Sequence, residues 1–182
     1  MAESKAHPYQ RGIFYEVMPL APVEAACIDV PAGPIRFVVE SRQLTNEILF
    51  AELPESRDNV EAGTVFDDFG ATLHVYGADD GLEHLRFDCF EHEPHYHYIM
   101  HAKGGNLVCR IDEVAEGDPV SWTIGRVRER LVPMLELAGA TELAASARAD
   151  SAAVGSGTEK IAALLVRARE LAEAHQNGGA SG

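Results

Sequence analysis

Alternating apolar and polar positions characterise the first two-thirds of this chain. The pattern is clearest over residues 71–76 and 83–90, which flank the glycine- and aspartate-rich stretch 77–81. Successive side chains of a strand point to opposite faces of a sheet, so each run has one apolar and one polar face. The stretch between the runs is typical of a turn. Together these residues predict an antiparallel β-hairpin.

Other runs rich in β-branched and aromatic residues surround this hairpin, and turn residues separate them. We expect further strands over residues 13–18, 26–30, 35–40 and 107–112, and the start of one at 64–66. Residues 46–53 fit either two helical turns or a buried strand. Short strands with close connections favour antiparallel pairing.

The periodicity changes after Gly117. Asp118-Pro119 is a typical helix start, and apolar residues then recur at helical spacing as far as Ala138. Pro133 is expected to kink or divide this helix because proline removes a backbone donor. Further along the chain we expect a short helix at 141–149, a flexible connector at 151–157, a last helix at 158–175 and a disordered end at 177–182.

These patterns predict an α+β fold, in which an antiparallel sheet or a small partial barrel precedes C-terminal helices. Residues 1–117 form the mainly β part, and residues 118–176 form a helical segment packed in the same domain. Leu164 and Leu165 lie on an apolar stripe of the last helix. Because a flexible connector precedes this helix, we expect it to join two copies of the chain in a homodimer.

Charge and cysteine content restrict the possible partners. The net charge of −14 opposes binding to nucleic acids and to anionic membranes. The sequence lacks an apolar run long enough for a membrane span, and its N-terminus does not resemble a signal peptide. Its three widely spaced cysteines, without a CxxC pair, suggest reduced thiols in a cytoplasmic protein.

The densest chemical signal is the stretch 91–101, which holds four of the eight histidines. Imidazole is the commonest metal ligand in proteins. His95 and His97 are two residues apart, so in a strand both reach one metal ion from the same face. The third ligand stays open among His92, His101, Glu91 and Glu93. A second interpretation of the stretch is an exposed strand edge or a hydrogen-bonded interface without metal.

The sequence Pro94-His95-Tyr96-His97, with His101 four residues further on, resembles the first metal-binding motif of cupins. In that family a His-x-His pair, a later glutamate and a distant histidine hold Fe, Mn, Ni or Zn inside a small β-barrel. His101 stands at the position of the family glutamate, and no clear second motif follows. The resemblance implies a cupin-like partial barrel and a divalent transition metal as cofactor.

Polar residues of the predicted hairpin extend the candidate site. If the hairpin pairs symmetrically about Asp80, His74 lies opposite Arg86, and Tyr76 lies opposite His84. One face then carries His74, Tyr76, His84, Arg86 and Asp88. A shift of one residue in register decides whether His95 and His97 share this face, and the sequence does not fix that register.

These residues suggest a small metal-dependent enzyme that acts on an organic small molecule. His84 or a tyrosine, taken as Tyr98, is a candidate for proton transfer, and Arg86 is a candidate for holding a substrate carboxylate. Lyase, isomerase, hydrolase and oxygenase chemistry all remain open. The alternative is a non-catalytic ligand-binding or assembly protein with helical oligomerisation.

Overall fold

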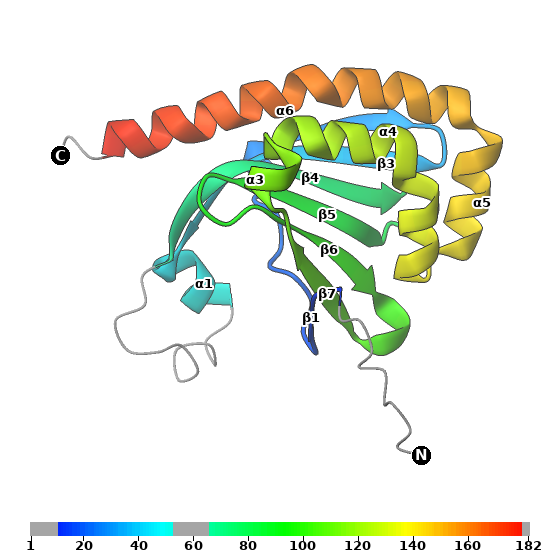
Figure 1. The fold of residues 1–182 in the computed structure, drawn as a ribbon, viewed down its shortest axis with the longest axis horizontal. Coiled ribbons are helices and arrows are strands. Elements are labelled where there is room, and N and C mark those ends of the chain that lie inside the picture. The colour runs from blue at the N-terminus through cyan, green and yellow to red at the C-terminus, as the bar shows by residue number, and fades with distance from the viewer. Residues whose placement is uncertain (1–10, 53–65, 180–182) are drawn as a thin grey trace, which may run out of the picture.

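The computed structural model describes residues 11–52 and 66–179, which form a sheet covered by helices (Figure 1). The strands are β1 (Ile13–Tyr15), β2 (Cys27–Ala32), β3 (Ile35–Thr45), β4 (Asp67–Gly77), β5 (Glu83–Phe90), β6 (His95–Met100) and β7 (Gly105–Arg110). The helices are α1 (Asn46–Glu52), α3 (Glu113–Glu116), α4 (Pro119–Ala138), α5 (Thr141–Ala149) and α6 (Ser151–Gly179), with short 3₁₀ helices η1 (Glu24–Ala26) and η2 (His101–Lys103).

All neighbouring strands of this sheet pair antiparallel, in the order β1-β7-β6-β5-β4-β3-β2. Strands β1 and β2 form its two edges, so the described residues build an open sheet. The predicted α+β fold, with an antiparallel sheet before C-terminal helices, is confirmed. Strands β2 to β7 lie in the sheet in the order in which they follow one another in the sequence. Turn and alternation patterns between consecutive strands could therefore predict their antiparallel pairing.

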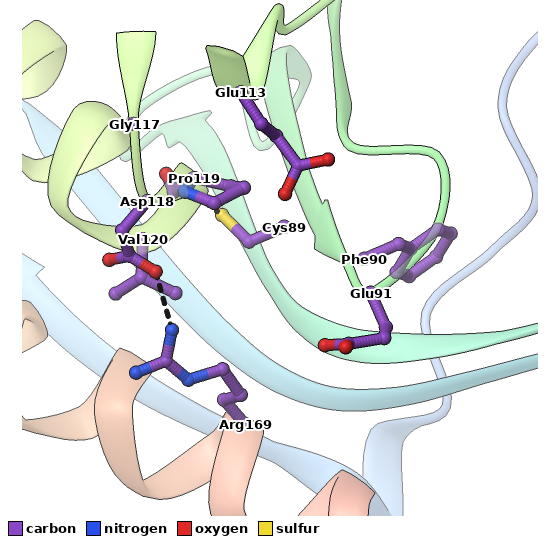
Figure 2. A pocket seen from close by; sticks show the side chains of 9 residues that line it. All are labelled: Cys89, Phe90, Glu91, Glu113, Gly117, Asp118, Pro119, Val120 and Arg169. Carbon is purple, nitrogen blue, oxygen red and sulfur yellow. Dashed lines mark hydrogen bonds and ion pairs between the residues drawn. The ribbon is translucent and has the colours of Figure 1, made fainter.

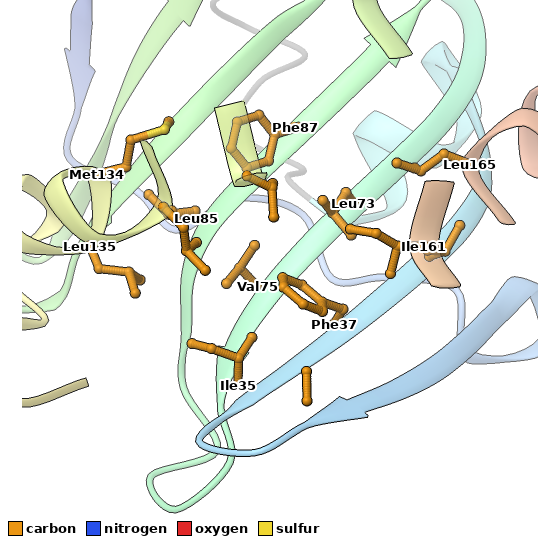
Figure 3. Packing of buried hydrophobic residues seen from close by; sticks show 14 of the residues in the cluster. Ile35, Phe37, Leu73, Val75, Leu85, Phe87, Met134, Leu135, Ile161 and Leu165 are labelled. Carbon is orange, nitrogen blue, oxygen red and sulfur yellow. The ribbon is translucent and has the colours of Figure 1, made fainter. Parts of the chain in front are cut away.

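Helices α4 and α6 cover one face of the sheet (Figure 1). Figure 3 shows Phe37 and Leu73 of the strands packed toward Ile161 and Leu165 of α6. These side chains are fully buried, and each contributes about 1.5–3 kcal/mol through removal from water. The apolar set of every central strand therefore faces the helices, and the polar set faces the other way.

The last helix differs from the expectation. Residues 151–157 are not a flexible connector but the first turns of α6. Gly157 lies so close to β2 that a Cβ atom on it would be 2.4 Å from the Cβ of Ala32. A glycine at this position therefore allows α6 to pack closely on β2, and it does not provide flexibility. Leu165 is fully buried against the chain's own sheet, which removes the reason for placing this stripe at a dimer interface. A homodimer stays a prediction.

Smaller differences concern element boundaries. Helix α4 continues through Pro133 and is not divided. Residues 46–52 form a helix, which resolves the ambiguity at that position. Of the strand start expected at 64–66, residues 64 and 65 lie outside the described residues, and β4 begins at Asp67. Residues 177–179 end α6, whereas 180–182 are not described.

Candidate metal centre

Strand pairing decides which polar residues meet. Arg86 of β5 lies opposite His97 of β6, and Asp88 lies opposite His95. His74 of β4 lies opposite Arg86, as the symmetric hairpin predicted. Cross-strand partners share a face. The histidine pair therefore joins the polar face of the hairpin, on the side of the sheet away from α4 and α6.

Three side chains on this face converge. The Oδ2 atom of Asp88 lies 2.9 Å from Nε2 of His97 and 3.4 Å from Nε2 of His95. The three ligand atoms lie within 4.8 Å of one another. Asp88 and His97 are buried, and His95 is partly buried. Two imidazoles and one carboxylate at this separation can hold a metal ion.

Hydrogen bonds at Nδ1 fix the orientation of both imidazole rings and the nitrogen that carries the proton. Nδ1 of His95 lies 2.7 Å from the carbonyl oxygen of Glu93, which only accepts, so this nitrogen carries the proton. Nδ1 of His97 donates to Oδ1 of Asn106 at 2.7 Å, because the amide nitrogen of Asn106 is used to donate to the Val17 carbonyl. In neutral histidines both Nε2 lone pairs then point at the carboxylate of Asp88. Outer hydrogen bonds of this kind orient histidine ligands at metal sites.

Asp88 is held as a charged group. Its Oδ1 atom accepts a hydrogen bond of 2.6 Å from the hydroxyl of Thr72. Burial alone would raise the pKa of Asp88. With the imidazoles protonated, a hydrogen bond donated by Nε2 of His97 and the nearby charges of His95, His97 and Arg86 hold that pKa well below its usual range. In the neutral histidines, the Nε2 lone pairs of His95 and His97 repel each other and also repel the Asp88 carboxylate. A proton or a metal cation between these atoms relieves the repulsion.

A buried ladder of charged residues lies beside this group. The ladder runs Arg86–Glu83–His74–Glu40–Arg42. His74 lies 2.7 Å from Glu83 and 3.0 Å from Glu40. Burial alone would lower the pKa of His74, but its hydrogen bonds to these two carboxylates raise it. Hydrogen bonds from Arg86 and His74 likewise outweigh burial and lower the pKa of Glu83 to about 2.

The ladder anchors an arm of backbone, residues 17–23, across the polar face. Arg86 donates to the carbonyl oxygen of Leu20 at 2.7 Å, and Arg42 donates to the same oxygen at 3.4 Å. The backbone N–H of Val23 donates to Glu40 at 2.8 Å. Together with the Asn106–Val17 bond, these contacts hold the arm through main-chain atoms. The side chains of the arm are therefore free to form a surface.

A cavity of about 170 Å³ lies between this arm and the metal group. Its floor includes Asp88, His95, His97 and Asn106, and its walls include apolar residues of the arm and of the sheet. Tyr15 of β1 also lines the cavity. The candidate metal site therefore opens into a space that a small molecule can enter.

A second, larger cavity of about 350 Å³ lies on the helix side of the sheet (Figure 2). Figure 2 shows the carboxylates of Glu91 and Glu113 facing this space and Arg169 paired with Asp118 at 2.6 Å. Burial raises the pKa of the Cys89 thiol to about 12, so this thiol is a poor nucleophile. Within residues 11–52 and 66–179, Asp88, His95 and His97 are the group that meets metal-ligand geometry.

Two candidate ligands lie away from the histidine pair. The backbone of His92 donates to Asp68, and its exposed ring packs against Phe69. Nε2 of His101 lies 2.8 Å from the carbonyl oxygen of Glu83 and its ring contacts His84. His101 is in η2, where the strand has ended, so it does not follow His95 and His97 along the face. Asp88, rather than His92 or His101, is the third residue of the group that could hold a metal ion.

Of the candidate catalytic residues, Tyr98 and His84 lie away from the metal group, and Arg86 is bonded to Glu83. Tyr98 lies opposite Leu85 and points to the helix side, because its parity along β6 is opposite to that of His97. His84 bonds Asp80 at the hairpin turn, about 13 Å along an extended strand from Asp88. Arg86 uses Nε and Nη2 for Glu83 and Nη1 for the Leu20 carbonyl, so neither edge is left open for bidentate binding of a substrate carboxylate.

Sequence reasoning placed Asp88 on the polar face but did not identify it as a ligand, and it missed Asn106 and Glu83. A β-bulge between Val75 and Tyr76 pairs Tyr76 with Glu83 instead of His84. The bulge thereby brings Glu83 beside His74 and Arg86. Arg86 and Asp88 are two residues apart in one strand and so share a face, and this spacing could have identified Asp88 as a candidate ligand. Asn106 had no comparable local signal because it acts through pairing of β6 with β7.

The fold and this site define an α+β protein with a candidate metal centre of two histidines and one aspartate. The chain belongs to the family described as Domain of unknown function (DUF7700), whose model matches residues 29–164. The match includes all three residues of the metal group. Neither a curated protein nor a solved structure matches the chain. Among the described residues, every helix is too short or too polar to cross a membrane.

Proposed function

We propose that this chain is a metal-dependent enzyme that acts on a small organic molecule at Asp88, His95 and His97. The observation that supports the proposal is the convergence of two Nε2 atoms and a carboxylate within 4.8 Å. Both imidazoles are already oriented by bonds at Nδ1. Three protein ligands leave coordination positions for water and substrate, as catalytic metal sites require.

The ligand set narrows the choice of metal. Imidazole nitrogen and carboxylate oxygen together suit Zn, Fe, Mn and Ni, whereas Mg and Ca prefer oxygen ligands. A divalent cation here also removes the repulsion between the two lone pairs and the Asp88 carboxylate. Such an ion lowers the pKa of bound water and polarises substrate oxygen atoms. Hydrolysis, isomerisation, elimination and oxygenation are all compatible with that chemistry.

The protein's own residues position the reactants. Asn106 and the Glu93 carbonyl fix the two rings, and Thr72 fixes the carboxylate. The charged ladder holds the arm as one wall of the cavity. The two guanidinium groups of the ladder are occupied by carboxylates and carbonyls, so they serve as structural supports.

Metal titration of chelator-treated protein tests the proposal directly. We expect about one equivalent of Zn, Mn, Ni or Fe(II) to bind per chain, measured by isothermal titration calorimetry and elemental analysis. His95→Ala, His97→Ala and Asp88→Asn are each expected to abolish binding. His92→Ala is the matched control, because His92 is a neighbouring histidine outside the group, and it is expected to bind normally. Unchanged binding by His95→Ala and His97→Ala would overturn the assignment.

A non-catalytic ligand-binding protein with the same metal centre is the second candidate function. It is favoured by the placement of His84 and Tyr98, the two residues expected to transfer protons, away from the cavity. Screening the metal-loaded protein for turnover of esters, amides and hydroxy acids separates the two candidates, with Asp88→Asn as the inactive reference.

A further inference from the structure

We propose that the cavity at the metal group selects a small uncharged molecule that has a short apolar body and one metal-coordinating group. This inference rests on the proposed metal-dependent function and names the substrate class. Four features of the cavity support it: the composition of its walls, the exposure of its rim, the pairing of its charged residues and its size.

The walls of the cavity are apolar on both sides. The arm contributes Val17, Met18 and Leu20, and the sheet contributes Leu44, Phe90 and Val108. The main-chain carbonyls of Val17 and Leu20 already accept hydrogen bonds from Asn106, Arg86 and Arg42. A ligand therefore meets hydrocarbon at the walls and metal ligands at the floor, as in small-molecule sites with one polar anchor.

The rim exposes large apolar side chains. Tyr15 is 46% exposed, Val17 44% and Met18 42%, and all three line the cavity. Because these three side chains share the lining of one cavity, they offer apolar surface that a ligand can cover. An apolar body that enters between the arm and the sheet removes part of this surface from water. The same body leaves its coordinating end at Asp88, His95 and His97.

The charged side chains that line the cavity are already paired, so none of them is free to bind a charged group of a ligand. Arg86 is paired with Glu83, and Arg42 is paired with Glu40, so neither cation is free to hold an anionic tail. The chain as a whole carries a net charge of −14, which disfavours approach of anions. Asp88 accepts from Thr72 and is itself one of the three candidate metal ligands, so no free carboxylate faces a cationic ligand from this floor.

The size of the cavity limits the body of the ligand. Its volume of about 170 Å³ is below the roughly 300 Å³ at which sites for drug-sized ligands begin. A short alkyl chain or a single ring is the expected body.

Binding of hydroxamic acids to the metal-loaded protein tests this inference. Acetohydroxamic, butanohydroxamic and hexanohydroxamic acids share one metal-binding group and differ only in apolar length. Affinity is expected to rise about fourfold for each added methylene that enters the cavity. A hexanohydroxamic acid with a terminal carboxylate is the matched charged probe, and it is expected to bind at least tenfold more weakly than its neutral counterpart.

A double variant locates the effect. Val17→Ser with Met18→Ser changes two exposed side chains and keeps the backbone carbonyl of Val17 that Asn106 uses. Hexanohydroxamate is expected to bind this variant several-fold more weakly, with acetohydroxamate unchanged. Val114→Ser is the control, because Val114 is 99% exposed on α3 and outside the cavity.

The outcomes separate this inference from the proposed function. If the protein binds no metal, the metal-dependent function itself fails. If metal binds but all three hydroxamates have equal affinity, or the charged probe binds as well as the neutral one, the metal centre stands and the substrate class is overturned. A gain with chain length that the double variant abolishes supports the inference.

Discussion

The Nδ1 atom of His97 lies 2.7 Å from Oδ1 of Asn106, and this contact determines which ring nitrogen of His97 is available to a metal. Asn106 is oriented for it because its amide nitrogen donates to the Val17 carbonyl at 2.7 Å. Asn106 is itself 2% exposed, so water does not replace either bond. A single buried amide therefore connects the candidate ligand to the arm that covers the site.

The first prediction concerns this amide. Asn106→Ala removes the acceptor from His97 and is expected to weaken metal binding about 10- to 100-fold. Asn106→Asp keeps an acceptor at that position and is expected to retain most of the affinity, while it loses the donor to Val17. Titration calorimetry with Zn or Mn compares the two variants. Equal weakening in both would show that the bond to His97 does not control the site.

The second prediction concerns the glycines of α6. Alanine normally stabilises a helix relative to glycine by about 1 kcal/mol. Gly155→Ala is expected to show that gain, because nothing lies within 4 Å of an added Cβ. Gly157→Ala is expected to lower the free energy of unfolding by about 1–3 kcal/mol, because its Cβ would be 2.4 Å from that of Ala32. Urea unfolding of both variants measures the contrast.

If Gly157→Ala is as stable as Gly155→Ala, the packing of α6 on β2 is not as close as described.

The third prediction concerns the pH dependence of stability. His74 is buried between Glu40 and Glu83, with Arg86 beside Glu83, and its two hydrogen bonds raise its pKa. A raised folded-state pKa gives stability that is fully present below the unfolded pKa of about 6.5 and is lost as pH rises through the folded value. Wild-type protein should therefore lose this contribution on the alkaline side.

His74→Gln lacks the titrating group and measures the contribution. Near pH 6 this variant is expected to be less stable than wild type by about 1.5–3 kcal/mol, because it removes the cation between the two buried carboxylates and leaves each of them with its arginine alone. The difference should narrow as pH rises. Urea unfolding in the presence of chelator at several pH values provides the test, and a difference that stays constant would contradict a charged His74.

The fourth prediction concerns thiol reactivity. Burial raises the pKa of Cys89 to about 12 and that of Cys27 to about 11, so both are protonated near neutral pH. Because the thiolate is the reactive form, neither should react rapidly with iodoacetamide at pH 7.5 in folded protein. Mass spectrometry after timed labelling locates any modification. Rapid labelling of Cys89, with slow labelling of Cys27, would contradict the buried position of Cys89.

Local patterns in the sequence determined much of the fold. Alternation over residues 83–90 matches the bounds of β5, and Asp118-Pro119 marks the start of α4, where the Asp118 side chain accepts from Ser121. Period and capping depend on near neighbours in the chain, so the sequence expresses them directly. The same parity rule paired His95 with His97 on one face.

Tertiary structure decided which groups those local elements bring together. The sequence alone determined that His95 and His97 share a face, but pairing of β5 with β6 placed Asp88 opposite His95. A one-residue bulge moved Glu83 into the ladder, and close packing of α6 turned Gly157 from an expected hinge into a contact. Register, bulges and helix packing depend on partners distant in sequence, and a change of one residue in register reverses the face of every side chain, so no local pattern specifies them.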